Sequence, residues 1–163
     1  RAVALMHGFV REIGRRIFGV EPDEDELYRR LLSVAEIDTG MRCRPTFAGT
    51  RTDPLVRGAF EEIGTEELRI GPMMGSVIRG VAAELCEMYR RMESPRSRLV
   101  CTGNGVRRNP LLLESLAEEF LCPTELHPFE EEAAIGAALT AGVGIGAFEG
   151  FSDTTLGGEQ GGR

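Results

Sequence analysis

Lysine is absent from this 163-residue sequence, and all 19 basic residues are arginine. A mechanism that forms a Schiff base on lysine, or that uses the lysine of a phosphate-binding P-loop, therefore has no such residue in this chain. Cysteine is sparse, and none of the four forms a C-x-x-C pair. Cys86 and Cys101 fall within apolar patterns. We expect reduced, structural cysteines at Cys43, Cys86, Cys101 and Cys122.

Other classes of site and partner are also disfavoured. No secretory signal is recognisable and no apolar run approaches the ~18 residues that span a bilayer, which predicts a cytoplasmic protein without a membrane partner. The 26 acidic residues give a net charge of -7, which opposes binding to phosphate backbones, so nucleic acid is not an expected partner. The two histidines, His7 and His127, lack metal-ligand spacing, and we predict neither a metal site nor a catalytic nucleophile.

The length allows one globular domain, or part of one, but not two lobes that close around a substrate. The sequence opens on Arg1 inside an apolar-periodic stretch, without an initiator Met, and we interpret it as a fragment. Residues 152–163 are mostly glycine and polar residues, which bury too little apolar surface to fold. We therefore predict a domain over 1–147 and a flexible tail over 148–163.

Hydrophobic periodicity predicts five helices. They cover residues 2–18, 22–37, 73–92, 110–121 and 131–141. Gly19 closes the first helix, and Asp23 and Asn109 are the N-caps of the second and the fourth. Strands are predicted at 98–102 and 124–127, with a weaker one within 56–63, and turns over 38–53. The alternation of strands and helices indicates an α/β domain with helices covering a sheet.

Two of these helices carry informative patterns. The helix at 73–92 has an apolar stripe that is predicted to face the core: Met74, Val77, Ile78, Val81, Leu85, Met88, Tyr89 and Met92. The helix at 131–141 is rich in small residues that permit close packing, namely Ala133, Gly136, Ala137 and Ala138.

The turn Gly103-Asn104-Gly105 lies between a strand and a helix. Glycine has no side chain to block a ligand and tolerates positive φ, so such a turn brings backbone amides close to a bound molecule. The alternative is that these residues only make a tight turn, which is common in α/β folds. The motif alone does not decide between the two.

The surrounding runs resemble the FGGY family of carbohydrate kinases over residues 1–147. Residues 99–112, LVCTGNGVRRNPLL, resemble that family's adenosine motif, and 130–139, EEEAAIGAAL, its closing helix. The segment that begins with RPTFAGTR at 44–51 and continues to Met88 is most similar to the sedoheptulokinase branch. The resemblance implies the actin-like, ribonuclease H-like fold, of which this chain would be part of the C-terminal lobe.

The resemblance also implies site residues for ATP. By position, Gly103, Asn104 and Gly105 correspond to the adenosine turn, and Arg108 and Asn109 stand where an asparagine of the family borders the adenine. Gly8 corresponds to a glycine near the phosphates. Two features depart from the family pattern: Asn104 replaces a second glycine, and the helix around Arg79 differs from the usual arginine-containing one.

The implied reaction transfers the γ-phosphoryl group of ATP, with Mg²⁺, to a sugar hydroxyl. No acidic residue of this chain matches the family's catalytic base, so the N-terminal lobe of the same kinase is the expected partner. The sugar is predicted to be a ketose such as sedoheptulose. A xylulose or glycerol kinase remains an alternative, as does a nonenzymatic actin-like module.

Charged groups elsewhere have simpler interpretations. Arg51 and Asp53 are interpreted as a salt-bridged turn rather than as a substrate site, because exposed ion pairs are common. The triplet Glu130 to Glu132 precedes a helix, so capping of the helix dipole explains it better than catalysis.

Overall fold

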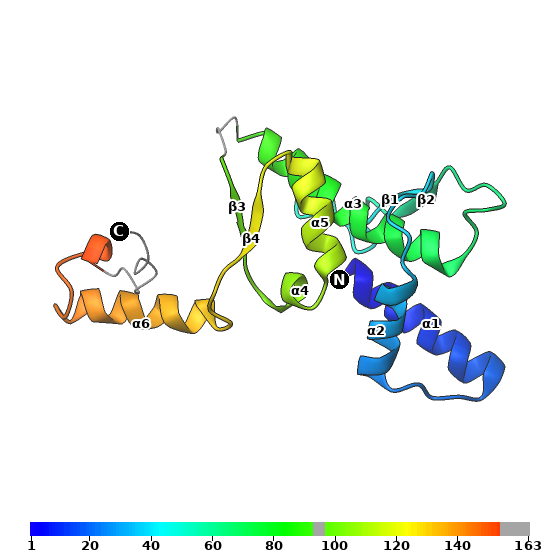
Figure 1. Ribbon diagram of the computed structural model, residues 1–163, viewed down its shortest axis with the longest axis horizontal. Coiled ribbons are helices and arrows are strands. Elements are labelled where there is room, and N and C mark those ends of the chain that lie inside the picture. The colour runs from blue at the N-terminus through cyan, green and yellow to red at the C-terminus, as the bar shows by residue number, and fades with distance from the viewer. Residues whose placement is uncertain (93–96, 154–163) are drawn as a thin grey trace, which may run out of the picture.

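The computed structural model describes residues 1–92 and 97–153, which form an α/β arrangement (Figure 1). Residues 154–163, most of the predicted tail, lie outside the described residues. The elements in chain order are α1 (Ala2–Phe18), α2 (Glu24–Val34), β1 (Arg42–Arg44), β2 (Ala59–Glu61), α3 (Ile70–Arg90), β3 (Leu99–Cys101), α4 (Asn104–Arg107), α5 (Pro110–Phe120), β4 (Thr124–Leu126), α6 (Glu132–Gly144) and the 3-10 helix η1 (Phe151–Asp153).

The predicted helix ends are confirmed by their capping groups. Gly19 ends α1 with a φ of 65°. Asp23 accepts the Glu26 amide at 2.8 Å, and Asn109 accepts the Leu112 amide at 3.1 Å. These side chains satisfy amides that have no partner within the helix. Both predicted N-caps thus do what their residue types favour.

The second helix is shorter than predicted. It ends at Val34 rather than near Ile37, because Ala35 is extended and the Glu36 amide donates to the carbonyl of Gly71 at 3.0 Å. A tertiary contact with the start of α3 replaces the next helical hydrogen bond.

Helix α3 is the element on which the others pack. Its first part contacts α1, α2 and β1, and its second part contacts α5. The most buried side chains follow steps of four residues through Met74, Ile78, Ala82 and Cys86. The Cys86 thiol also donates to the carbonyl of Glu119 at 3.1 Å, which places α5 against this face.

In its second half, the predicted apolar stripe is wrong at Leu85, Met88 and Met92, whereas Tyr89 packs against the core as predicted. Leu85 and Met88 are 42% and 49% exposed, and Met92 is 69% exposed. The small residues Ala82 and Cys86 allow α5 to approach closely, so the buried face passes through them instead of through the larger side chains.

Two glycines of α3 permit equally close contact with the other neighbours. A Cβ atom on Gly75 would lie 1.8 Å from the carbonyl oxygen of Glu36, and one on Gly80 would lie 2.3 Å from that of Cys43. Both positions therefore admit only glycine without movement of the backbone.

The four described strands form two separate pairs. β1 and β2 are antiparallel, with Arg42 opposite Glu61, and β3 and β4 are parallel, with Leu99 opposite Thr124. β2 lies within the weak strand predicted at 56–63, whereas β1 lies in a region predicted to be turns. β1 packs on α3 and β4 packs on α5, and the two pairs lie apart in the molecule (Figure 1).

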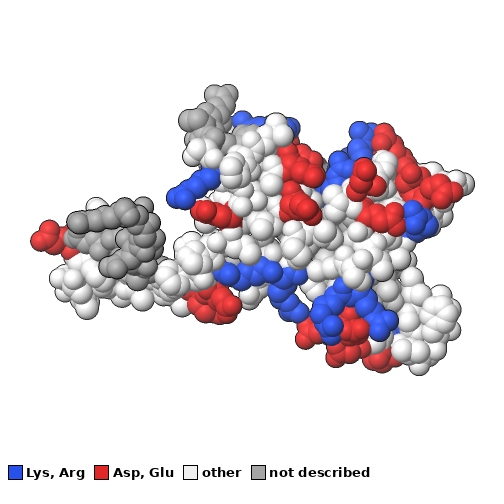
Figure 2. Space-filling model, in the orientation of Figure 1, with Lys and Arg blue, Asp and Glu red and all other residues white. Residues whose placement is uncertain are grey.

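Helix α6 projects from the end of the molecule opposite α1 and α2 (Figure 1). None of its residues is buried, and its small residues at 133 and 136–138 are all exposed, so the close packing predicted for them is not seen in the described part. Its surface is largely uncharged, unlike the mixed charges elsewhere (Figure 2). Within residues 1–92 and 97–153, no helix has the length and apolar character required to cross a membrane.

Candidate functional site

The glycine turn after β3 starts a short helical segment. Gly103 has a φ of 87°, and its carbonyl accepts the Arg107 amide at 3.2 Å, so α4 begins where the sequence predicts only a turn. A Cβ atom placed on Gly103 or on Gly105 meets nothing within 4 Å. The backbone on this side of the turn is therefore open to an approaching molecule.

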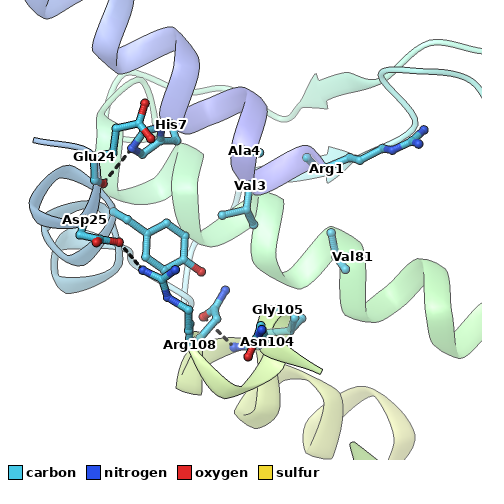
Figure 3. Close-up of a pocket in the computed structure, with 14 residues that line it drawn as sticks. Arg1, Val3, Ala4, His7, Glu24, Asp25, Val81, Asn104, Gly105 and Arg108 are labelled. Carbon is cyan, nitrogen blue, oxygen red and sulfur yellow. Dashed lines mark hydrogen bonds and ion pairs between the residues drawn. The ribbon is translucent and has the colours of Figure 1, made fainter. Parts of the chain in front are cut away.

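A cavity of about 470 Å³ lies beside this turn (Figure 3). Residues of α1, α2 and α3 line it on one side, and α4 and the start of α5 line it on the other. Its volume lies within the range of small-molecule sites, roughly 300–1,000 Å³. Four of the predicted site residues line the cavity: Asn104, Gly105, Arg108 and Asn109.

The other two predicted residues lie outside this lining. Gly103 precedes the lining residue Asn104, at the start of the turn. Gly8 is exposed on α1, where its neighbour His7 contributes to the lining instead. The structure thus brings together four of the six residues.

Two residues of α2 hold the side chain of Arg108. Its guanidinium lies 2.5 Å from the Asp25 carboxylate, and its Cζ lies 5.4 Å from the centre of the Tyr28 ring (Figure 3). Burial raises the pKa of Tyr28, and the nearby positive charge of Arg108 opposes this shift. The guanidinium consequently lies against an aromatic ring at the wall of the cavity.

Asn109 and His7 complete the polar surroundings. Asn109 is 1% exposed, and its side-chain oxygen caps α5. Asn109 therefore stabilises the helix start that forms this part of the cavity wall. Nε2 of His7 lies 3.1 Å from the carbonyl oxygen of Glu24. The cavity thus combines apolar, cationic and anionic groups, which suits a ligand with both planar and polar parts.

Sequence reasoning did not identify Asp25 and Tyr28 as candidate site residues. Their local sequence is that of an ordinary amphipathic helix, and only the tertiary fold places α2 opposite the glycine turn. No local motif signals this contact.

Other charged residues differ from their sequence interpretation. No ion pair joins Arg51 to Asp53 among the described residues; the Asp53 carboxylate accepts the Leu55 amide at 2.9 Å, so the predicted salt bridge is wrong. Glu131, at the N-cap of α6, makes no side-chain capping bond. Glu132 interacts with its own backbone amide and with Arg107, so capping accounts for only part of its environment.

The described residues contain no group of three or more His, Cys, Asp or Glu side chains arranged to hold a metal ion. His127 contacts the ring of Phe129, with ring centres 5.5 Å apart.

Residues 9–145 match the model of the FGGY family of carbohydrate kinases, C-terminal domain. The chain belongs to this family. It is 27% identical over 126 residues to human sedoheptulokinase, covering 74% of this chain and 26% of that enzyme. It is also 27% identical over 130 residues to the glycerol kinase of Alteromonas mediterranea, covering 77% and 26%.

Solved structures of FGGY kinases share the fold. Xylulose kinase from Rhodospirillum rubrum aligns with a TM-score of 0.67 at 20% identity, over 93% of this chain and 31% of that one. Plasmodium falciparum glycerol kinase with ADP aligns with a TM-score of 0.62 at 16% identity, over 90% and 30%. The predicted fold class, part of an actin-like C-terminal lobe, is confirmed. This chain spans about a quarter to a third of the length of these relatives.

Proposed function

We propose that this chain is the nucleotide-binding part of an ATP-dependent carbohydrate kinase and that the cavity beside the glycine turn holds the adenosine of ATP. One observation carries the proposal: Asn104, Gly105, Arg108 and Asn109, predicted from the adenosine motif, line one cavity of suitable size. The open backbone at Gly103 and Gly105 fits the approach of a nucleoside. The ADP-containing glycerol kinase of the same fold supports a nucleotide as the ligand.

Gly103 and Gly8 complete the proposed set. Gly103 provides the positive φ on which the turn depends. Gly8 remains a proposed phosphate-side residue on the strength of its position in the sequence alone. Gly8 is in α1 and follows His7, which lines the cavity.

The proposed reaction transfers the γ-phosphoryl group to a sugar hydroxyl, with Mg²⁺ neutralising phosphate charge. The described residues offer no carboxylate cluster that fits Mg²⁺, and no acidic residue of the chain matches the family's base. We therefore assign to this chain the binding and orientation of the nucleotide, and assign the base, the metal ligands and the sugar contacts to the rest of the protein.

The N-terminal lobe of the same kinase is the proposed partner of this chain. Supporting evidence comes from α6, an apolar helix none of whose residues is buried, and from the coverage of only 26–31% of the relatives. An exposed apolar surface of this kind is typical of a contact region. We further propose residues 1–147 as the folded unit and 148–163 as its tail.

The proposed substrate is a seven-carbon ketose such as sedoheptulose. The similarity to sedoheptulokinase supports it, while the similarity to glycerol and xylulose kinases keeps those substrates as alternatives. A pocket that hydrogen-bonds the additional hydroxyls leaves polar groups unpaired with a shorter sugar. Comparing kcat/KM for sedoheptulose, xylulose and glycerol on the full-length enzyme tests this, and a preference for either shorter sugar overturns the assignment.

The nucleotide assignment is tested by Gly103→Val in the full-length enzyme. At a φ of 87° a branched side chain strains the turn and enters the open space beside it. We expect weaker binding of ATP with sugar affinity retained, as measured by calorimetry. Equal losses for both ligands would indicate general unfolding and contradict the assignment.

A further inference from the structure

Arg107 and Glu132 form an ion pair unlike the others in the described part of the chain. Their closest atoms, Nη2 and Oε1, lie 3.0 Å apart, and the two side chains are only 18% and 20% exposed. In every other ion pair of the described residues, both side chains are at least 37% exposed. Charge pairs with little solvent access are screened less and hold their geometry better than exposed pairs.

Arg107 also ties the chain after β4 to the glycine turn. Its Nη2 donates to the carbonyl oxygens of His127, at 2.5 Å, and of Phe129, in addition to Glu132. Arg107 belongs to α4, whereas its three partners belong to the segment that leads from β4 into α6 (Figure 1). One side chain thus links the turn and the start of α6.

The Glu132 carboxylate is connected to the turn through Arg107, whose amide donates to the carbonyl of Gly103 at 3.2 Å. Its own backbone amide, the Arg107 side chain and the Gly103 amide favour the charged form and lower the pKa of Glu132, while desolvation opposes this shift. The carboxylate is therefore ionised at neutral pH. It lies 3.0 Å from the guanidinium of Arg107, which follows the turn whose first residue, Gly103, has a positive φ.

We propose that Glu132 is a positioning residue for the nucleotide: its ion pair holds Arg107, which fixes the start of α4 and so orients the Asn104 and Gly105 backbone toward the cavity. This inference rests on the proposed function of the cavity. Glycine has the greatest backbone freedom, so an unrestrained turn would have to be ordered when the ligand binds. A turn that is ordered in advance avoids that entropic cost and binds more tightly.

The test uses the full-length enzyme and the variants Glu132→Ala and Glu132→Gln, with Glu131→Ala as the matched control. Glu131 is the preceding residue, carries the same charge and makes no capping bond. The dissociation constants of ADP and of the sugar are measured by calorimetry, together with Tm. We expect Glu132→Ala to weaken ADP by about tenfold, the loss typical of one hydrogen bond to a charged group.

Sugar affinity should change by less than about twofold, because Glu132 acts only on the nucleotide turn. Glu132→Gln retains an acceptor oxygen and should give an intermediate loss of ADP, which also provides the measurement if Glu132→Ala does not fold. Unchanged ADP affinity in the Glu132 variants, equal loss of ADP and sugar, or an equal effect of Glu131→Ala would overturn the positioning role. Failure of the wild-type enzyme to bind ADP would instead overturn the proposed function itself.

Discussion

Gly75 and Gly8 lie in the interiors of helices, but only Gly75 touches a neighbouring backbone. A Cβ atom on Gly75 would lie 1.8 Å from the Glu36 carbonyl, whereas one on Gly8 meets nothing within 4 Å. We expect Gly75→Ala to lower the free energy of unfolding by about 2 kcal/mol, because the segment that follows α2 must move away from α3. Gly8→Ala should raise it by roughly 0.5–1 kcal/mol, since alanine favours the helix.

Urea denaturation of the two variants, monitored by circular dichroism, measures both changes. The pair controls for the loss of glycine flexibility, which the two substitutions share. Equal stabilisation of both variants would show that the backbone at Glu36 does not pack against Gly75 as described.

Cys43 gives the stability of the protein a dependence on alkaline pH. Burial raises the pKa of its thiol from 9.0 to about 11. Below pH 9 the thiol is protonated in both states and its contribution is fully present. Between pH 9 and 11 the unfolded chain releases the proton while the folded state retains it, so the free energy of unfolding falls.

Cys43→Ser removes this titrating group with little change of size. Its free energy of unfolding should fall less steeply between pH 9 and 11 than that of the unmodified protein, as measured by urea denaturation at intervals across this range. Identical slopes for the two proteins would exclude Cys43 as the source.

At this scale, the sequence predicts capping residues well and cavity walls poorly. Asp23 and Asn109 cap helices as expected, because the preference of Asp and Asn for N-caps is local. Asp25 and Tyr28 meet Arg108 only after α2 has packed near the glycine turn, and no short-range preference records that contact.

Among the described elements, α6 has no buried residue and projects from the rest of the fold (Figure 1). If the N-terminal lobe covers α6, Ala138→Arg should lower the Tm of the full-length enzyme, because the new charge would be buried at the contact. Ser33→Arg, on the exposed face of α2, is the matched control and should change Tm little. Differential scanning calorimetry measures both, and equal shifts would count against an apolar contact at α6.

The elements also show where periodicity succeeds and where it fails. β3, β4 and α5 are found as predicted because an apolar run, a glycine turn and an Asn-Pro helix start are all local signals. β1 has three residues, of which only Cys43 is buried, and such a strand gives no clear alternation. In α3, the buried face includes Ala82 and Cys86. Hydrophobic periodicity does not predict this face, because small residues contribute little to the pattern.

At the scale of the whole molecule, we expect the chain to bind a nucleotide without catalysing phosphoryl transfer from it. The sugar contacts and the base are assigned to the rest of the kinase, and positioning of both reactants provides most of the rate enhancement. Residues 1–163 alone should therefore release no ADP in a coupled assay with ATP and any of the three sugars. Turnover by this chain would show that the catalytic groups lie within it.

Because α3 is the common packing partner of α1, α2, β1 and α5, its amides can exchange with solvent only when most of the molecule opens. Hydrogen–deuterium exchange followed by mass spectrometry should accordingly find the slowest peptides at residues 74–86 and much faster ones in α6. Protection that is lowest in α3 would contradict its central place. The same measurement on the full-length enzyme should slow exchange in α6 while leaving the order of the other peptides unchanged.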